Sequence, residues 1–169
     1  MSDRKTPRYA SDLMAGQVAL VTGSGSGMGR ATALEMASCG ARLALFARRE
    51  EPLEETAEMI RTAGGEAFVV PGDTRDEDSI ETAMGRIKEH YGQLDVLVNN
   101  AGGQYIASAR DITNKGFEAV IRNNLIGSWQ MTRAAADHFM YDSGGSVVFV
   151  TAISGRTALT GFAHTVAAR

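Results

Sequence analysis

The stretch Thr22-Gly-Ser-Gly-Ser-Gly-Met-Gly29 decides the fold, because it stands between the apolar run Val18-Ala-Leu-Val21 and a helix-like segment. We expect a buried strand to end here, the chain to turn tightly, and a helix to begin with its free N–H groups facing the turn. The glycine spacing is G-x-x-x-G-x-G, over Gly23, Gly27 and Gly29, rather than G-x-G-x-x-G. Such a turn lets a pyrophosphate approach the backbone, and the helix dipole attracts its charge. The alternative is that it is only a turn.

The composition is that of one globular domain with a sizeable core: 169 residues, 44% hydrophobic, 22% charged, with a formal net charge of −3. This mild acidity argues against nucleic acid as a partner. A single cysteine, Cys39, suits a reducing compartment, so we expect a cytoplasmic protein. No apolar segment approaches the ~18–20 residues that span a bilayer. Residues 1–14 are polar and predict a flexible N-terminal tail, followed by one domain over residues 15–169.

Strand-like and helix-like stretches alternate along the whole chain. The stretches expected to be strands are Gln17–Thr22, Arg42–Ala47, Ala67–Pro71, Leu94–Val98 and Ser146–Thr151. The stretches expected to be helices are Gly27–Ser38, Glu51–Ala63, Asp76–Tyr91 and about Thr113 to Phe139. This alternation predicts a parallel sheet covered on both faces, since parallel strands need crossover connections. We therefore expect a doubly wound, Rossmann-type α/β fold in three layers, with a nucleotide at the carboxyl ends of the strands.

Two further clusters follow expected strands. Asn99-Asn-Ala-Gly102 follows the fourth strand, and Asp73-Thr74 follows the third. Because the carboxyl ends of parallel strands meet at one edge, both should lie near the glycine-rich turn. With Thr-Gly-x-x-x-Gly-x-Gly and Asn-Asn-Ala-Gly at this separation, the chain resembles the short-chain dehydrogenase/reductase family from about Ala15 to the last residue.

The resemblance implies a nicotinamide dinucleotide cofactor. It implies that Asp73 holds the adenine ring, although a solvated turn aspartate is the alternative for this residue. It also implies that the residues after the fourth strand line the adenosine side. The residues expected to bind the cofactor are Gly23, Ser24, Ser26, Gly27, Met28, Gly29, Arg48, Asp73, Thr74, Asn100, Ala101, Gly102 and Thr151.

The end of the second strand bears on the choice between NAD and NADP. An NAD site places an acidic residue there, to accept a hydrogen bond from the ribose hydroxyl. This chain has Ala47-Arg48-Arg49, and an arginine can bind a 2′-phosphate through charged hydrogen bonds. We therefore favour NADP(H) over NAD, with Arg48 as the main phosphate ligand. The alternative is a solvated arginine pair.

The catalytic positions depart from the family pattern, which has a serine after the fifth strand and then Tyr-x-x-x-Lys. When Gly155 is aligned with the glycine of the Ser-x-x-Gly pattern, Ala152 takes the serine position, Thr165 the tyrosine position and Arg169 the lysine position. No tyrosine of the chain has a lysine four residues later. A threonine hydroxyl is a weaker acid than a phenol. Arg169 could bind a ribose, but it would not titrate.

A branch of the family offers a chemistry that does not require the phenol. Asn99–Gln104, Asn124–Gly127 and Ala163–Arg169 resemble the trans-2-enoyl-CoA and 2,4-dienoyl-CoA reductases. Those enzymes deliver hydride to an alkene conjugated with a thioester, and hydrogen-bond donors can stabilise the resulting enolate. The resemblance thus predicts reduction of an enoyl thioester, with Asn124, Thr165 and Arg169 as catalytic residues.

Two alternatives remain open: a carbonyl or alcohol oxidoreductase of the same family, similar to 3-oxoacyl reductases, and a cofactor-binding relative or fragment without turnover. His164 is either a donor near the nicotinamide or a surface residue at a helix start. No metal site is expected. Family members continue with further strands and a substrate-covering segment, so we expect a fragment of a longer reading frame that lacks the C-terminal strands. The resemblance also implies a homo-oligomer at full length.

Overall fold

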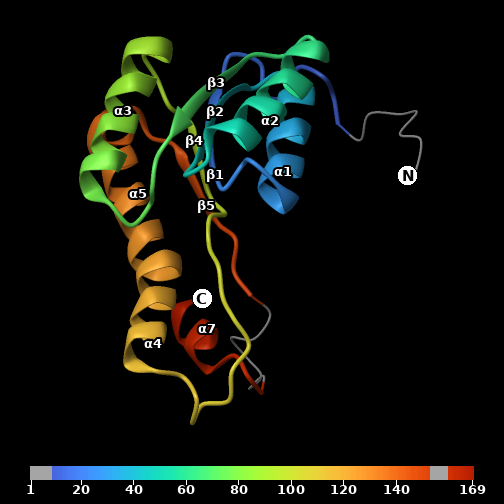
Figure 1. Cartoon of the computed structure of the whole chain (residues 1–169). Coiled ribbons are helices and arrows are strands. Elements are labelled where there is room, and N and C mark those ends of the chain that lie inside the picture. Colours follow the sequence, from blue (N-terminus) through green and yellow to red (C-terminus); the bar gives the residue numbers. More distant parts are fainter. Residues whose placement is uncertain (1–8, 153–159) are drawn as a thin grey trace.

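The computed structural model describes residues 9–152 and 160–169, and within these ranges five strands form one parallel sheet in the order β3-β2-β1-β4-β5 (Figure 1). The strands are β1 (Val18–Thr22), β2 (Arg42–Ala47), β3 (Ala67–Pro71), β4 (Val96–Asn99) and β5 (Ser146–Phe149). The helices that connect them are α1 (Gly27–Ser38), α2 (Glu50–Thr62), α3 (Glu77–Tyr91), α4 (Asn114–Ile121), α5 (Gly127–Ala135) and α6 (Tyr141–Ser143), and α7 (Ala163–Ala168) follows β5. The strand order reverses at β1, which pairs with β2 on one side and β4 on the other.

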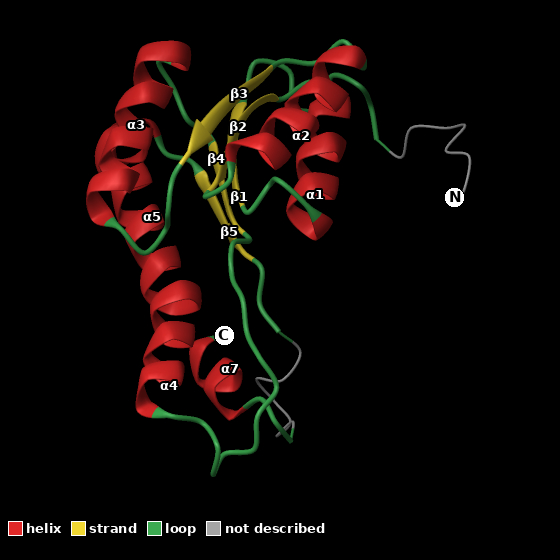
Figure 2. Ribbon diagram, viewed as in Figure 1, coloured by secondary structure: helices red, strands yellow, loops and turns green. Residues whose placement is uncertain are grey.

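Helices cover both faces of the sheet (Figure 2). Alternate residues of β1 point to opposite sides, as the period of a strand requires. Val18 and Leu20 belong to the apolar cluster under α3 and α5, whereas Ala19 and Val21 belong to the cluster under α1 and α2. The predicted doubly wound, three-layer α/β fold is confirmed, and β1 is buried along its whole length.

The hydroxyl of Thr22 joins the ends of β1 and β4 at the point where the strand order reverses. Its Oγ1 accepts hydrogen bonds from the amides of Asn100 (3.0 Å) and Ala101 (2.9 Å), and it donates to Val98 O (3.3 Å). The side-chain amide of Asn100 donates in turn to Thr22 O (2.8 Å). These bonds hold the glycine-rich turn after β1 beside the loop after β4.

The predicted long helix forms one continuous rod that changes its hydrogen-bonding pattern twice. The π-helical segment η1 (Arg122–Ile126) separates α4 from α5, and a second one, η2 (Ala136–Met140), separates α5 from α6. The rod begins at Asn114, where the Thr113 side chain accepts from Gly116 N (3.1 Å), and it extends to Ser143, beyond the expected end at Phe139.

Two strands are shorter than predicted. β4 begins at Val96 rather than Leu94, because the side chain of Asp95, just before it, accepts the Val18 amide (2.7 Å). β5 ends at Phe149 rather than Thr151.

The start of the described chain packs on the rest of the molecule. Residues 11–16 form turns, and the Met14 amide donates to the carbonyl of buried Cys39 (2.8 Å). Residues 1–8 of the predicted tail lie outside the described residues. Within the described ranges, no helix has both the length and the apolar character needed to cross a bilayer.

We expect Thr22→Val to lower the free energy of unfolding by about 1–3 kcal/mol, because it leaves the amides of the half-buried residues Asn100 and Ala101 without their acceptor at nearly constant volume. Thr62→Val is the matched control, since the exposed Thr62 hydroxyl donates to the Glu58 side chain (3.3 Å) at the surface, and its change should stay within about 0.5 kcal/mol. Urea unfolding followed by circular dichroism measures both. Equal stability of the two variants would contradict the role assigned to Thr22.

Candidate active site

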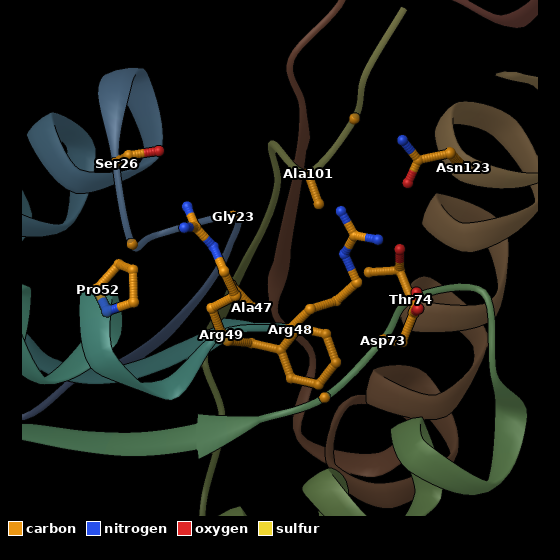
Figure 3. Close-up of a pocket in the computed structure, with 14 residues that line it drawn as sticks. Gly23, Ser26, Ala47, Arg48, Arg49, Pro52, Asp73, Thr74, Ala101 and Asn123 are labelled. Atoms are coloured by element: carbon orange, nitrogen blue, oxygen red, sulfur yellow. The ribbon is translucent and has the colours of Figure 1, made fainter.

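A cleft opens at the carboxyl edge of the sheet, near the point where the strand order reverses (Figure 3). Its walls come from the ends of four strands, from the start of α2 and from the π-helical segment η1. The lining residues are Gly23, Gly25, Ser26, Phe46, Ala47, Arg48, Arg49, Pro52, Gly72, Asp73, Thr74, Ala101, Gly102 and Asn123. The structure therefore brings together the three motifs that the sequence placed after strands one, three and four.

The glycine-rich turn has the shape that a close approach of backbone atoms requires. Gly23 and Gly27 have left-handed φ angles of +69° and +54°. A Cβ on Gly29 would collide with the carbonyl oxygen of Gly23 and lie 2.6 Å from Nδ2 of Asn100. The Ser26 side chain does not cap α1, so the first N–H groups of this helix remain for an anion.

The other predicted residues of the turn have different positions. Ser26 lines the cleft, whereas Met28 and Ser24 are not among its lining residues. Met28 is exposed on the first turn of α1. Ser24 is fully buried, and its hydroxyl has no partner among the described residues, but its carbonyl accepts a hydrogen bond from Thr56 Oγ1 (3.0 Å). Ser24 thus holds the turn in place through its backbone.

Both arginines after β2 line the cleft. Arg48 extends toward Ala101 and Thr74, whereas Arg49 extends toward Ser26 (Figure 3). The sequence predicted Arg48 as the main phosphate ligand of this pair, and the structure places Arg49 in the cleft as well. Two guanidinium groups that line the same cleft make it attractive to a phosphate.

The carboxylate of Asp73 is held by a neighbouring arginine that the sequence reasoning did not identify. Arg75 donates from Nε to Oδ1 (2.9 Å) and from Nη2 to Oδ2 (2.5 Å). This hydrogen bonding keeps the pKa of Asp73 below its ordinary value of 3.8. The next residue, Thr74, is buried against the rod, where a Cβ on Gly127 would lie 3.0 Å from its Oγ1. The loop after β3 is thereby fixed beneath the cleft.

The side-chain amide of Asn124 is buried (5% exposed) and fully hydrogen-bonded. Its Nδ2 donates to Val120 O and Gly103 O, both at 2.8 Å. Its Oδ1 accepts from Gly103 N (3.2 Å) and from Arg169 Nε (2.8 Å). Asn124 lies in the π-helical segment η1, and it connects the rod to the loop after β4 and to α7.

Arg169 reaches across the ends of two strands. Its Nη1 donates to Val150 O (3.0 Å), and its Nη2 donates to Ala101 O (3.2 Å) and Asn100 O (3.4 Å). Burial lowers the pKa of this guanidinium. A Cβ on Gly102 would collide with Arg169 Nη2 and lie 2.5 Å from Asn124 Oδ1. Because Gly102 also lines the cleft, the pair Asn124–Arg169 lies directly beside the cleft.

The remaining predicted positions lie around this pair. Thr165 and His164 are buried in α7, and neither the Thr165 hydroxyl nor either ring nitrogen of His164 has a partner among the described residues. The alternative of a surface position for His164 is wrong, because its ring packs edge-on against Tyr105 at 4.5 Å and is fully buried. Thr151 is exposed after β5 and does not line the cleft. Half-buried Ala152 takes the serine position of the family pattern, and Gly155 lies outside the described residues.

Within the described ranges, no three His, Cys, Asp or Glu side chains lie together in a way that could hold a metal ion.

We expect Arg75→Gln to raise the pKa of Asp73 toward 3.8, because it removes the main donors to this carboxylate. The lowered pKa means that Asp73 stabilises the fold above pH 3.8, and that this contribution is lost as the pH falls through the folded-state pKa. An NMR titration of the carboxyl carbon measures the shift. Arg86→Gln is the control, since Arg86 contacts Val69 O (3.4 Å) and the Phe68 ring instead. An unchanged Asp73 pKa in Arg75→Gln would contradict the assignment.

The chain is similar in sequence and in fold to known proteins. Peroxisomal 2,4-dienoyl-CoA reductase [(3E)-enoyl-CoA-producing] of Arabidopsis thaliana is 31% identical over 152 residues, which are 85% of this chain and 51% of the relative. Trihydroxynaphthalene reductase of Colletotrichum orbiculare is 32% identical over 148 residues, 87% of this chain and 52% of the relative. This chain therefore spans about half the length of the curated relatives it matches.

A solved structure has a similar fold. The citronellol catabolism dehydrogenase of Pseudomonas aeruginosa PAO1 superposes with a TM-score of 0.91 at 38% identity, over 96% of this chain and 66% of that structure. Residues 17–168 match the sequence profile of the family described as short chain dehydrogenase. The cleft at the carboxyl edge, the glycine-rich turn and these similarities lead to one conclusion: the chain belongs to the short-chain dehydrogenase/reductase family, whose oxidoreductases use NAD(P)(H).

Proposed function

We propose that the protein is an NADPH-dependent oxidoreductase that reduces an activated carbon–carbon double bond, such as that of an enoyl thioester. The observation that carries this proposal is the hydrogen-bonded pair Asn124–Arg169 beside the cleft, with Thr165 where the family pattern has its tyrosine. This arrangement offers a fixed positive charge and the Thr165 hydroxyl, which has no partner among the described residues, but no phenol in the pattern's position. Such a site suits a reaction in which charge develops on an oxygen.

The described residues fit the cofactor. The glycine-rich turn and the start of α1 would hold the pyrophosphate, because a Cβ on Gly29 would close the turn and no side chain caps the helix. Arg48 and Arg49 would hold the 2′-phosphate. Asp73 would bind the adenine through its lone pairs that Arg75 leaves free. When bound, NADPH supplies a hydride.

The chain's own residues would then position the substrate and stabilise its oxygen. Arg169 carries a positive charge next to Gly102, and a developing enolate oxygen nearby would gain from that charge in a buried setting. Thr165 lies one helical turn before Arg169, and its buried hydroxyl can bind a substrate oxygen without giving up another partner. Asn124 orients Arg169 through its Oδ1.

The names of the relatives support two substrate classes. The dienoyl-CoA reductases of Arabidopsis thaliana and Danio rerio, the latter 28% identical over 154 residues, support an acyl thioester. The trihydroxynaphthalene reductase and the citronellol catabolism dehydrogenase support a second candidate, a carbonyl or alcohol oxidoreductase. We place the enoyl reduction first because Thr165 and Arg169 depart from the Tyr-x-x-x-Lys pattern.

The proposal includes self-association of the full-length protein, in addition to its small-molecule substrate. On the rod, Trp129 is 61% exposed and Leu125 is 51% exposed. Large apolar side chains that are exposed to this extent favour a surface that a partner covers. Met131, on the same helix as Trp129, is fully buried in the core, so the exposed side chains form a separate face.

The cytoplasmic location of the protein stays a prediction.

The cofactor choice is tested with the variants Arg48→Ala and Arg49→Ala. Each should weaken NADPH binding by about ten- to a hundredfold, because a charged hydrogen bond to phosphate is lost, and should change NADH binding much less. Isothermal titration calorimetry on the full-length protein measures both ligands. Arg61→Ala, at the far end of α2, is the control and should leave both affinities unchanged. Equal losses for NADPH and NADH would overturn the assignment.

The substrate class is tested by NADPH oxidation with a crotonyl thioester and with the matching 3-ketoacyl thioester. We expect turnover with the crotonyl substrate to exceed turnover with the keto substrate, because the site lacks the phenol of the family pattern that protonates a carbonyl oxygen. A preference for the keto substrate would favour the second candidate function. Cofactor binding without turnover of either substrate would overturn the proposal and indicate a non-catalytic relative.

A further inference from the structure

The guanidinium of Arg30, in the first turns of α1, connects the glycine-rich turn to α2. Its Nη2 donates to Gly25 O in the turn (2.6 Å) and lies 3.3 Å from Pro52 O and 2.7 Å from Glu55 Oε2 in α2. Its Nε donates to Thr56 Oγ1 (2.9 Å). One largely buried side chain, 23% exposed, thereby binds acceptors on both elements.

Thr56 makes the same connection from α2. Its side chain is fully buried, and its hydroxyl lies 3.0 Å from Ser24 O in the turn and 3.0 Å from Pro52 O. The hydroxyl accepts from Arg30 Nε, and its single hydrogen lies within reach of both carbonyls, of which it can serve one at a time. Two successive carbonyls of the turn, those of Ser24 and Gly25, are therefore held by side chains that lie outside it.

The turn and α2 also touch directly. A Cβ on Gly25 would lie 3.0 Å from Cβ of Pro52, so the absence of a side chain at Gly25 permits this approach. Pro52 is the third residue of α2, and Arg49 is the N-cap of the same helix. Gly25, Arg49 and Pro52 all line the cleft. The contacts of Arg30 and Thr56 thus act on the spacing between the turn and the two arginines after β2.

We propose that Arg30 and Thr56 form a turn clamp: they are positioning residues that set the distance between the pyrophosphate subsite at the turn and the 2′-phosphate subsite at Arg48 and Arg49. The inference rests on the proposed function, because it needs a cofactor that occupies both subsites at once. A ligand that bridges two subsites binds tightly only when their separation matches its own. The clamp fixes that separation before the ligand arrives.

The ion pair with Glu55 is not what gives the clamp its effect. Glu55 is 56% exposed, and an exposed ion pair contributes little free energy. The hydrogen bonds to the turn have buried side chains or backbone carbonyls as partners. Loss of such a partner costs more free energy than loss of an exposed ion pair. This difference separates a positioning role from a surface ion pair, and it can be measured with matched variants.

The test compares a bridging ligand with a ligand of one subsite, by calorimetry on the full-length protein. Arg30→Gln and Thr56→Val should each weaken NADPH binding by about tenfold or more, because the effective concentration of the second subsite falls. Adenosine 2′-monophosphate, which carries the 2′-phosphate but no pyrophosphate, should keep its affinity within about twofold. A variant that is merely destabilised lowers the apparent binding of both ligands together, so the ratio identifies positioning.

Four further variants complete the comparison. Thr56→Ser should restore NADPH affinity, because it keeps the hydroxyl. Arg30→Lys should give an intermediate loss and covers the case in which Arg30→Gln does not fold. Glu55→Gln should bind like the unaltered protein, and so should Arg61→Gln, whose ion pair with Glu54 (3.2 Å) lies at the other end of α2.

Three results would overturn the turn clamp. One is unchanged NADPH affinity in Arg30→Gln and Thr56→Val, and the second is an equal fall for NADPH and adenosine 2′-monophosphate. The third is the same loss of NADPH binding in Glu55→Gln as in Arg30→Gln. If the unaltered protein binds neither NADPH nor adenosine 2′-monophosphate, the cofactor assignment fails together with the clamp. If it binds both and the variants show no selective loss, the clamp alone fails.

Discussion

The nucleotide cleft depends on the bond network of one hydroxyl group, that of Thr22. The strand order of the sheet reverses at β1, and the carboxyl ends of β1 and β4 lie side by side at this point. Thr22 Oγ1 holds the amides of Asn100 and Ala101, and Asn100 returns a hydrogen bond to Thr22 O. The turn and the loop after β4 are consequently placed close enough that only glycine fits at position 29. The shape of the cleft therefore depends on a small group of polar hydrogen bonds at the end of an otherwise apolar sheet.

The architecture was predictable because the sequence signals are local and agree with one another. Apolar runs alternate with amphipathic stretches, and glycines or polar clusters follow each strand, so a parallel sheet with its motifs at one edge is the consistent solution. The strand ends were harder to predict. β4 starts at Val96 because Asp95 binds the Val18 amide, a contact between residues far apart in the chain.

The site was predictable at the level of motifs but not of individual side chains. Pattern and resemblance identified the turn, Asp73, Asn124 and Arg169, and the structure places all of them in or beside the cleft. The same reasoning missed that Arg49 lines the cleft and that Ser24 is buried with its hydroxyl unpartnered. Which side of a backbone faces a ligand depends on packing with α2, and no spacing rule within the turn contains that information.

The π-helical segment η1 has a consequence for how the rod divides its contacts. A turn that accommodates one additional residue shifts the angular phase of everything after it by about 100° relative to an uninterrupted α-helix. α4 can thus face α7 while α5 faces α3 and β4, although both belong to one continuous element. A one-residue deletion within 122–126 would rewind the rod and rotate its two halves against each other. Because Asn124 lies in this segment, the same deletion would displace its side chain from Gly103 and Arg169.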